Sequence, residues 1–147
     1  MFQRILLAYD GSSHAKRAYE VAVGLALKLG ARLDIVQVVA HQHAPEAVAA
    51  FAEAERAGNP DQIELAQCAA NSLTPLWSEA RSRGIKEVSG DVLRGDPAHE
   101  IVSYARATEA DLIVMGRRGR GRIEGLVLGS VSSHLTSHAE CPVLTVK

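Results

Sequence analysis

The sequence has little of what marks secreted or membrane-spanning proteins. Its two cysteines, Cys68 and Cys141, lack CxxC spacing. They could pair, but the chain opens on the strand-like run MFQRILLAYD rather than on a secretory signal. A reduced, cytoplasmic protein is therefore expected, with both cysteines acting as small buried hydrophobic residues. No apolar run approaches the roughly 20 residues that span a bilayer, so no membrane partner is expected.

Neither the charge nor the aromatic residues indicate a nucleic-acid partner. The formal net charge is −1, and aromatic residues make up 4% of the chain. The arginines of 117–122 are concentrated locally, and no aromatic residues interleave with them to stack on bases. Nucleic acid is therefore not expected to bind.

Two familiar phosphate-binding motifs are also absent. No string matches the Walker pattern Gly-x4-Gly-Lys-Ser/Thr, and the junction after the first predicted strand reads DGSSHA rather than GxGxxG. Any nucleotide site in this chain must therefore be of another type.

Short apolar runs alternate with segments of helical periodicity along the whole chain. A length of 147 residues fits one domain with a real core. The alternation predicts a single doubly wound α/β domain over residues 1–147, with a mainly parallel five-stranded sheet flanked by helices. The predicted strands are 4–9, 33–39, 86–93, 111–115 and 143–146, and the predicted helices are 15–29, 60–84 (kinked or split at Pro75), 97–105 and 131–138.

The segment GRRGRGRIEGLVLGS, residues 116–130, lies between the fourth predicted strand and the last helix. Ligands of such sheets bind at the carboxyl ends of the strands, where Asp10 and Val38 should meet this segment. Glycine backbone amides can converge on phosphate oxygens, and Gly129-Ser130 opens a helix whose first amides lack internal partners. Two alternatives stay open. The segment could be a surface loop that binds no ligand, and Asp10 could only cap a helix.

The glycine spacing resembles that of a known family. The pattern Gly-x2-Gly-x9-Gly-Ser is found at Gly116, Gly119, Gly129 and Ser130. The segments RILLAYDGS, VLRGDPAHEI, DLIVMG and GSVSSHLTSHAECPVLTV occur in the same order as in that family. The chain is similar to the nucleotide-binding members of the universal stress proteins over nearly its whole length.

This resemblance implies roles for individual residues. Asp10 matches the residue that contacts the nucleoside sugar, and Val38 matches the position whose backbone reads the adenine edge. The residues implied for the nucleoside pocket are Ala8, Tyr9 and Met115, and those for the ribose and phosphate loop are Gly116, Gly119, Gly129, Ser130, Val131 and Ser132. The implied ligand is ATP, with AMP or ADP as alternatives and Mg²⁺ as companion.

Arginine and histidine residues outside the glycine pattern are further candidates for contacts with phosphate, metal or a partner surface. Among the loop arginines, Arg117 is expected to pair with phosphate, since guanidinium matches phosphate geometry. The pair His41 and His43 could chelate a metal, but no further ligand cluster accompanies it, so no resident metal site is predicted. His134 and His138 are expected to be packing or interface residues.

Three functions fit the sequence. The first is a nucleotide-responsive regulatory homodimer, paired through strand 143–146 as family members commonly are, that acts on a protein partner the sequence does not identify. The second is a slow ATPase or self-phosphorylating protein; Glu124 is the one candidate base in the loop, so an efficient enzyme is not expected. The third is a chaperone-like or scaffold protein that binds no nucleotide. The role of residues 41–59 stays open.

Overall fold

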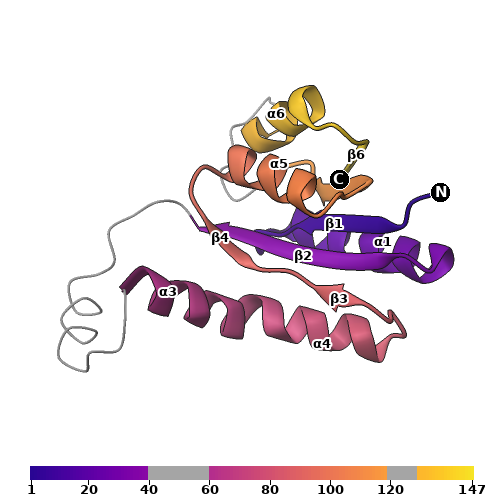
Figure 1. The fold of residues 1–147 in the computed structure, drawn as a ribbon, viewed down its shortest axis with the longest axis horizontal. Helices are drawn as coiled ribbons and strands as arrows, with labels where there is room; N and C mark the ends of the chain where they lie inside the picture. Colours follow the sequence, from indigo (N-terminus) through magenta and orange to yellow (C-terminus); the bar gives the residue numbers. More distant parts are fainter. Residues whose placement is uncertain (40–59, 119–128) are drawn as a thin grey trace.

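The chain folds as a single α/β domain built on one parallel sheet (Figure 1). The computed structural model describes residues 1–39, 60–118 and 129–147. The strand order is β3-β2-β1-β5-β6, with β4 paired to β2, and every pairing among the described strands is parallel. The strands are β1 Arg4–Ala8, β2 Arg32–Val39, β3 Val88–Ser89, β4 Val92–Arg94, β5 Leu112–Gly116 and β6 Val143–Val146.

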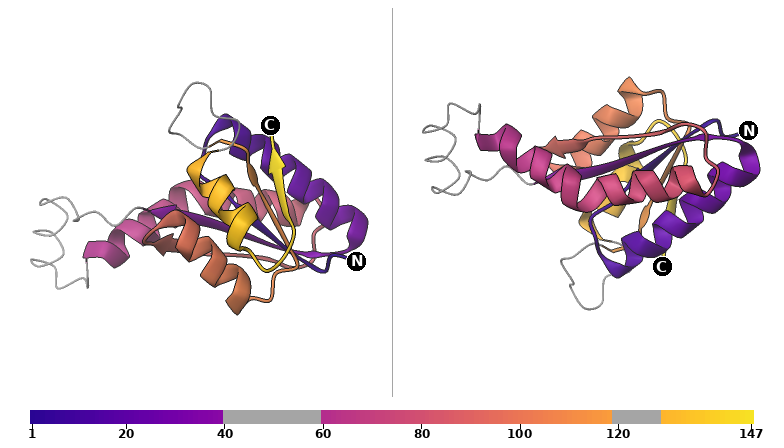
Figure 2. Two further views of the ribbon diagram at one scale, coloured as in Figure 1. Left: turned by 90° about the horizontal axis from the view of Figure 1, so that it is seen from above. Right: turned by 90° about the horizontal axis from the view of Figure 1, so that it is seen from below.

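Helices cover both faces of the sheet, as a doubly wound fold requires (Figure 2). Helices α1, α3 and α4 pack on one face, and α5 and α6 pack on the other. Within the described part of the chain, no helix is both long and apolar enough to cross a bilayer. The helices are α1 Ser13–Leu29, α3 Pro60–Cys68, α4 Thr74–Ser82, α5 Pro97–Ala107 and α6 Ser130–His138, with a π-helical turn η1 at Ala69–Leu73.

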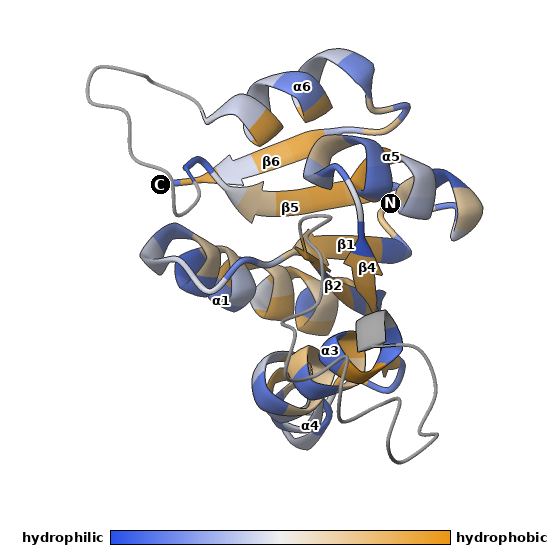
Figure 3. Ribbon diagram, turned by 90° about the vertical axis from the view of Figure 1, so that its left-hand side faces the viewer, coloured by the Kyte–Doolittle hydropathy of each residue, from blue (hydrophilic) through white to orange (hydrophobic). Residues whose placement is uncertain are grey.

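The central strands are apolar on both sides because both of their faces are covered. In β1, Ile5 and Leu7 join the core under α1 and α4, while Leu6 joins the core under α5 and α6. All three side chains are buried. Figure 3 shows the same division, with hydrophobic strands inside and hydrophilic helix surfaces outside. The continuous apolar runs of the sequence are thus confirmed as doubly buried strands.

Local signals place the ends of α1 correctly. The Ser12 hydroxyl accepts a hydrogen bond from the amide of Ala15 at 3.1 Å, so Ser12 is the N-cap. Gly30 ends the helix in the left-handed conformation, with φ of 65°. Asp10 lies before the cap and accepts from the amide of Ser12 at 2.9 Å, so it organises the turn rather than capping the helix directly.

The predicted third strand, 86–93, is divided into β3 and β4, which makes a sheet of six strands rather than five. The break is at Gly90, whose φ is +143°. A Cβ built on Gly90 would lie 1.8 Å from the carbonyl oxygen of Ile35. The Ile35 carbonyl also accepts from Trp77 Nε1 at 3.4 Å. The strand is interrupted because its backbone passes very close to β2 at this point.

The helix predicted over 60–84 is split next to Pro75, as expected, and a π-helical turn separates its two parts. Between α3 and α4, the amide of Thr74 bonds to the carbonyl of Ala69, five residues back. A proline within an α-helix clashes with the carbonyl four residues before it. Widening the preceding turn therefore lets the chain continue as a helix through the proline.

Tyr19 links α1 to α4 and makes the stability of the fold depend on pH in the alkaline range. Its ring is buried, and its hydroxyl donates to the carbonyl of Leu76 at 3.1 Å. Burial, followed by the charge of Glu79, raises the pKa of Tyr19 to about 12. The folded state therefore holds this proton more tightly than the unfolded chain, whose tyrosines have an ordinary pKa near 10.

The stabilisation from neutral Tyr19 is fully present below about pH 10 and is lost as the pH rises through about 12. We expect the urea midpoint of the wild-type protein to fall across this interval. It should fall less steeply in Tyr19→Phe, which has no proton to lose there. Equal slopes for the two proteins would contradict this assignment.

Candidate functional site

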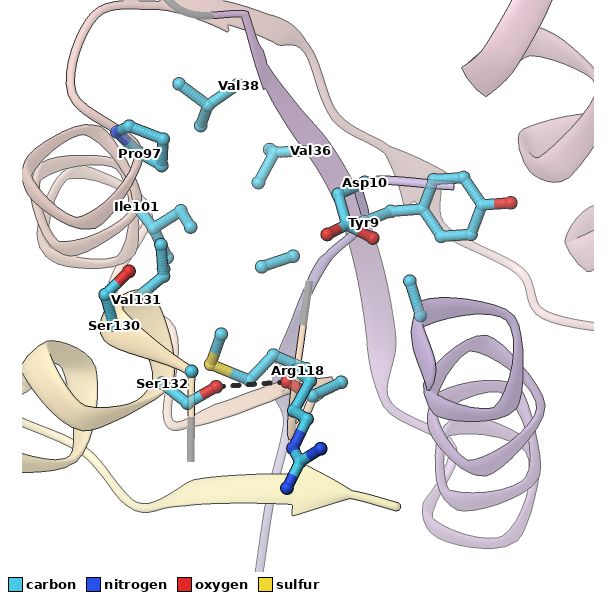
Figure 4. A pocket seen from close by; sticks show the side chains of 15 residues that line it. Tyr9, Asp10, Val36, Val38, Pro97, Ile101, Arg118, Ser130, Val131 and Ser132 are labelled. Carbon is cyan, nitrogen blue, oxygen red and sulfur yellow. Dashed lines mark hydrogen bonds between the residues drawn. The ribbon is translucent and has the colours of Figure 1, made fainter. Parts of the chain in front are cut away.

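A cavity of about 240 Å³ opens at the carboxyl ends of β1, β2 and β5 (Figure 4). The chain order of the strands reverses here, because β1 pairs with β2 on one side and with β5 on the other. Of the residues assigned to the site from the sequence and described by the structure, all except Arg117 line this cavity. They are Ala8, Tyr9, Asp10, Val38, Met115, Gly116, Gly129, Ser130, Val131 and Ser132.

One side of the cavity is apolar. Val36 and Val38 come from β2, Pro97 and Ile101 from α5, and Met115 from β5. In Figure 4 the labelled side chains of Val36, Val38, Pro97 and Ile101 surround one end of the open space. Such a wall accepts a flat, weakly polar group, with backbone groups at its edge to read polar atoms.

Asp10 follows the end of β1. It is the one acidic residue among the described residues that line the cavity. Its Oδ1 accepts from the amide of Ser12 at 2.9 Å, which fixes the side chain. The other carboxylate oxygen remains for a ligand. In Figure 4 the carboxylate projects toward the open space, whereas the ring of Tyr9 points away from it. Tyr9 packs with the core under α1 and α4, so its backbone rather than its ring borders the cavity.

The start of α6 provides hydrogen-bond donors to the cavity. Gly129 is the N-cap and has no side chain to satisfy the first helical amides. The Gly129 carbonyl accepts from Ser133, which begins the helical pattern. The amides of Ser130 and Val131 therefore have no partner within the helix, and both residues line the cavity. Unpaired amides and the positive end of the helix dipole favour an anion at this position.

Hydrogen bonds close the glycine segment at both of its ends. The amide of Arg117 donates to the carbonyl of Val146 at 2.7 Å, and the amide of Gly129 donates to the carbonyl of Arg117 at 2.9 Å. The buried hydroxyl of Ser132 lies 3.1 Å from the carbonyl of Gly116 and 2.9 Å from that of Arg117. The hydroxyl proton is thus directed to the backbone, and Ser132 holds α6 against β5 rather than presenting a donor to the cavity.

We expect Ser132→Ala to lower the free energy of unfolding by about 1–3 kcal/mol, because two carbonyls lose their shared donor. Denaturant unfolding followed by circular dichroism measures this. Ser133→Ala is the matched control: its side chain is exposed on the same helix, and a change within about 0.5 kcal/mol is expected. Equal effects of the two substitutions would show that the Ser132 contacts contribute nothing.

Gly116 is a glycine because of helix packing. A Cβ at this position would lie 2.8 Å from Cβ of His14 and 2.9 Å from the amide nitrogen of Ala15, in the first turn of α1. From the sequence, the glycines of this segment are expected to belong either to a phosphate-binding loop or to a surface loop that binds no ligand. At Gly116, the close approach of α1 to β5 is sufficient to exclude a side chain.

Several lining residues were missed from the sequence, and one assigned residue that the structure describes does not line the cavity. Arg118 lines it where Arg117 was expected, and Gly119 lies outside the described residues. Val36 could have been found, because it lies two residues before Val38 and so on the same face of β2. The other missed residues are Ala15, Pro97 and Ile101. They gave no local signal, because they reach the cavity only through the packing of α1 and α5.

Two further interpretations change with the structure. Cys68 and Cys141 are free and only partly buried, and they pack in different core clusters. Burial, followed by the charge of Asp111, raises the pKa of the Cys141 thiol. His134 and His138 are exposed on α6 and stack on each other, so they are not packing residues of this chain.

Comparison with known proteins finds relatives that match this chain over its whole length. The model of the universal stress protein family matches residues 1–147. The "universal stress protein in QAH/OAS sulfhydrylase 3′ region" of Thermus aquaticus is 40% identical over 148 residues, covering 100% of both chains.

Solved structures show the same fold. The universal stress protein UspA from Lactobacillus plantarum is 25% identical, with a TM-score of 0.80 over 99% of this chain and 98% of its own. The universal stress protein from Archaeoglobus fulgidus in complex with dAMP is 25% identical, with a TM-score of 0.67 over 99% and 98%. Because the family model spans every residue and a relative matches end to end, this chain belongs to the universal stress protein family.

Proposed function

We propose that this chain is a cytoplasmic, ATP-binding regulatory protein that acts as a homodimer. The observation that carries the proposal is the meeting, in one cavity, of an apolar wall, the Asp10 carboxylate and the uncapped start of α6. These three features match the three parts of a nucleotide. The two free cysteines agree with a reducing compartment.

Each part of the nucleotide has a matching surface. The base would lie between β2 and α5, with its edge against the backbone at Val38. The ribose hydroxyls would donate to the Asp10 carboxylate. The phosphates would accept from the amides of Ser130 and Val131, as anions do at helix N-termini. The dAMP complex of the Archaeoglobus fulgidus relative supports an adenine nucleotide in this fold.

Mg²⁺ would accompany the phosphates rather than occupy a prepared protein site. Asp10 is the one acidic residue among the described residues that line the cavity. In nucleotide sites Mg²⁺ commonly takes one or two carboxylates together with phosphate oxygens. Removing Mg²⁺ with a chelator should therefore weaken binding of ATP more than binding of AMP, which has fewer phosphate oxygens to share a cation.

At most slow hydrolysis or self-phosphorylation is proposed. Phosphoryl transfer needs a group that positions or deprotonates the nucleophile. Asp10 accepts from Ser12 with one oxygen and would hold the ribose with the other, and Glu124, the candidate base of the loop, lies outside the described residues. We therefore expect a turnover number far below about 1 per second, the low end for typical enzymes. Faster release of phosphate by the purified protein would favour an enzyme.

The homodimer would form through β6. This strand lies at the edge of the sheet and pairs only with β5 among the described strands. Its residue Leu144 is 38% exposed. An exposed edge strand offers unpaired backbone groups to a second copy. Gel filtration with light scattering should show a dimer at micromolar concentration, and a monomer alone would contradict this part of the proposal.

The direct test is to denature freshly purified protein and identify any released nucleotide by chromatography. The stripped protein is then titrated with ATP, ADP and AMP, each with and without Mg²⁺. Released adenine nucleotide, or micromolar binding, supports the proposal. Protein that releases no nucleotide and does not bind ATP at millimolar concentration would favour the alternative, a scaffold or chaperone-like stress protein.

A further inference from the structure

The two histidines of α6 form an exposed stacked pair outside the cavity. His134 and His138 are one helical turn apart, so their side chains lie on the same face of the helix. Their ring centroids are 4.1 Å apart, with an angle of 15° between the ring planes. Both residues are exposed, so an ion can reach the two rings from solvent.

A backbone hydrogen bond already orients one of the rings. Nδ1 of His138 lies 2.9 Å from the carbonyl oxygen of His134. A carbonyl oxygen only accepts, so Nδ1 carries the hydrogen and the lone pair of the neutral ring is on Nε2. Metal-binding histidines commonly donate their second N–H to a backbone carbonyl, which fixes both tautomer and ring orientation. His138 has this arrangement.

The position of the pair on the helix also favours a cation. His138 is the last residue of α6, where unpaired carbonyls give the helix end a partial negative charge. The opposite end, at Ser130, is the end proposed to face phosphate. The two ends lie roughly 12 Å apart at 1.5 Å per residue. The same helix dipole thus suits an anion at one end and a cation at the other.

We propose that His134 and His138 form a surface site for a transition-metal cation, with Nε2 of each ring as a ligand. No group of three or more histidine, cysteine or acidic residues is placed for a metal within residues 1–39, 60–118 and 129–147. Water therefore completes the coordination, as in an open and exchangeable site rather than a closed structural one. Imidazole ligands bind Cu²⁺ more tightly than Ni²⁺ or Zn²⁺. While its hydrogen bond holds the His138 ring, the His134 ring would rotate from the parallel stack until its Nε2 approaches the same metal.

The test is a titration of the purified full chain with Cu²⁺ at about pH 8, where ordinary imidazoles are neutral, followed by electron paramagnetic resonance. One Cu²⁺ per chain, with hyperfine coupling to imidazole nitrogens, is expected. His134→Gln and His138→Gln should each weaken binding on the order of ten- to a hundredfold, at least as much as losing an outer-shell partner. Both side chains are exposed, so neither substitution should impair folding.

Two controls separate this site from His41, His43 and His99. His99 is exposed on α5 and has no histidine one turn away, so His99→Gln should bind Cu²⁺ as the wild type does. The double variant His41→Gln/His43→Gln should also be unaffected. Unchanged affinity in both α6 variants, or loss of binding in the double variant, would overturn the proposal. Nucleotide affinity should stay the same in His134→Gln, so this test is independent of the proposed function.

Discussion

Replacing Ser130 by proline is expected to lower the affinity for ATP on the order of ten- to a hundredfold, the effect of losing one hydrogen bond of about 1.5–3 kcal/mol to a charged group. Ser130 is the first residue of α6, and its amide has no partner within the helix. Proline lacks this N–H, so the substitution removes one proposed phosphate donor from the backbone itself.

The fold should tolerate this substitution. Proline suits the first position of a helix because its φ is already helical. The preceding residue, Gly129, has φ of −69° and ψ of 165°, which is the extended backbone that precedes proline most readily. The protein already begins α5 with Pro97 and α3 with Pro60. The melting temperature should therefore not fall.

Ser130→Ala is the matched control, since it removes the hydroxyl and keeps the amide. Isothermal titration calorimetry with ATP should give a much smaller loss for alanine than for proline. If both variants bind ATP as the wild type does, the start of α6 does not hold the phosphates. If alanine loses as much as proline, the hydroxyl rather than the backbone amide is the ligand.

Gly90→Ala is expected to destabilise the protein by at least about 3 kcal/mol, near the upper end for single substitutions. Two penalties add. The backbone of Gly90 has φ of +143°, which alanine rarely adopts. The new Cβ would also lie 1.8 Å from the carbonyl oxygen of Ile35 in the neighbouring strand. Because that oxygen belongs to the buried backbone of β2, it cannot move aside as the end of a side chain could.

Gly30→Ala shows the cost of a positive φ where the added Cβ meets no neighbour. Gly30 also has positive φ, at +65°, but an added Cβ meets nothing within 4 Å. Its cost should be roughly 1–2 kcal/mol, the conformational penalty alone. Urea unfolding of the three proteins measures the difference through the midpoint and slope. Equal destabilisation by the two substitutions would mean that β2 adjusts and the close contact at Gly90 is unimportant.

Much of the fold could be predicted from local pattern. Serine at the start of α1 and Gly30 at its end mark the helix in the sequence, and the structure has the same boundaries within two residues. The apolar run of β5 and the start of α5 at Pro97 were also predicted, because burial and helix initiation depend on neighbouring residues in the chain. The division of the third strand was not predicted, since it depends on how closely Gly90 passes to Ile35.

The candidate site was predicted in part. Asp10, Val38 and the glycine segment follow predicted strands, so a parallel sheet must bring them to one edge. The contribution of α5 through Ile101 was missed, because an apolar residue on a helix gives the same pattern whether it faces a core or a cavity. Arg118 was missed because adjacent arginines are equivalent in sequence and differ only in their direction once the backbone is placed.

The alternation of strands and helices, and the glycine spacing with its family resemblance, could be read from residues close together in the chain. The tertiary structure alone showed why particular residues occupy their positions. Gly116 is a glycine because His14 approaches it, and the Ser132 hydroxyl is directed to the carbonyls of Gly116 and Arg117 rather than to a ligand. Periodicity records whether a residue is buried. It does not record which distant backbone lies against that residue, because such contacts arise only when separate elements pack together.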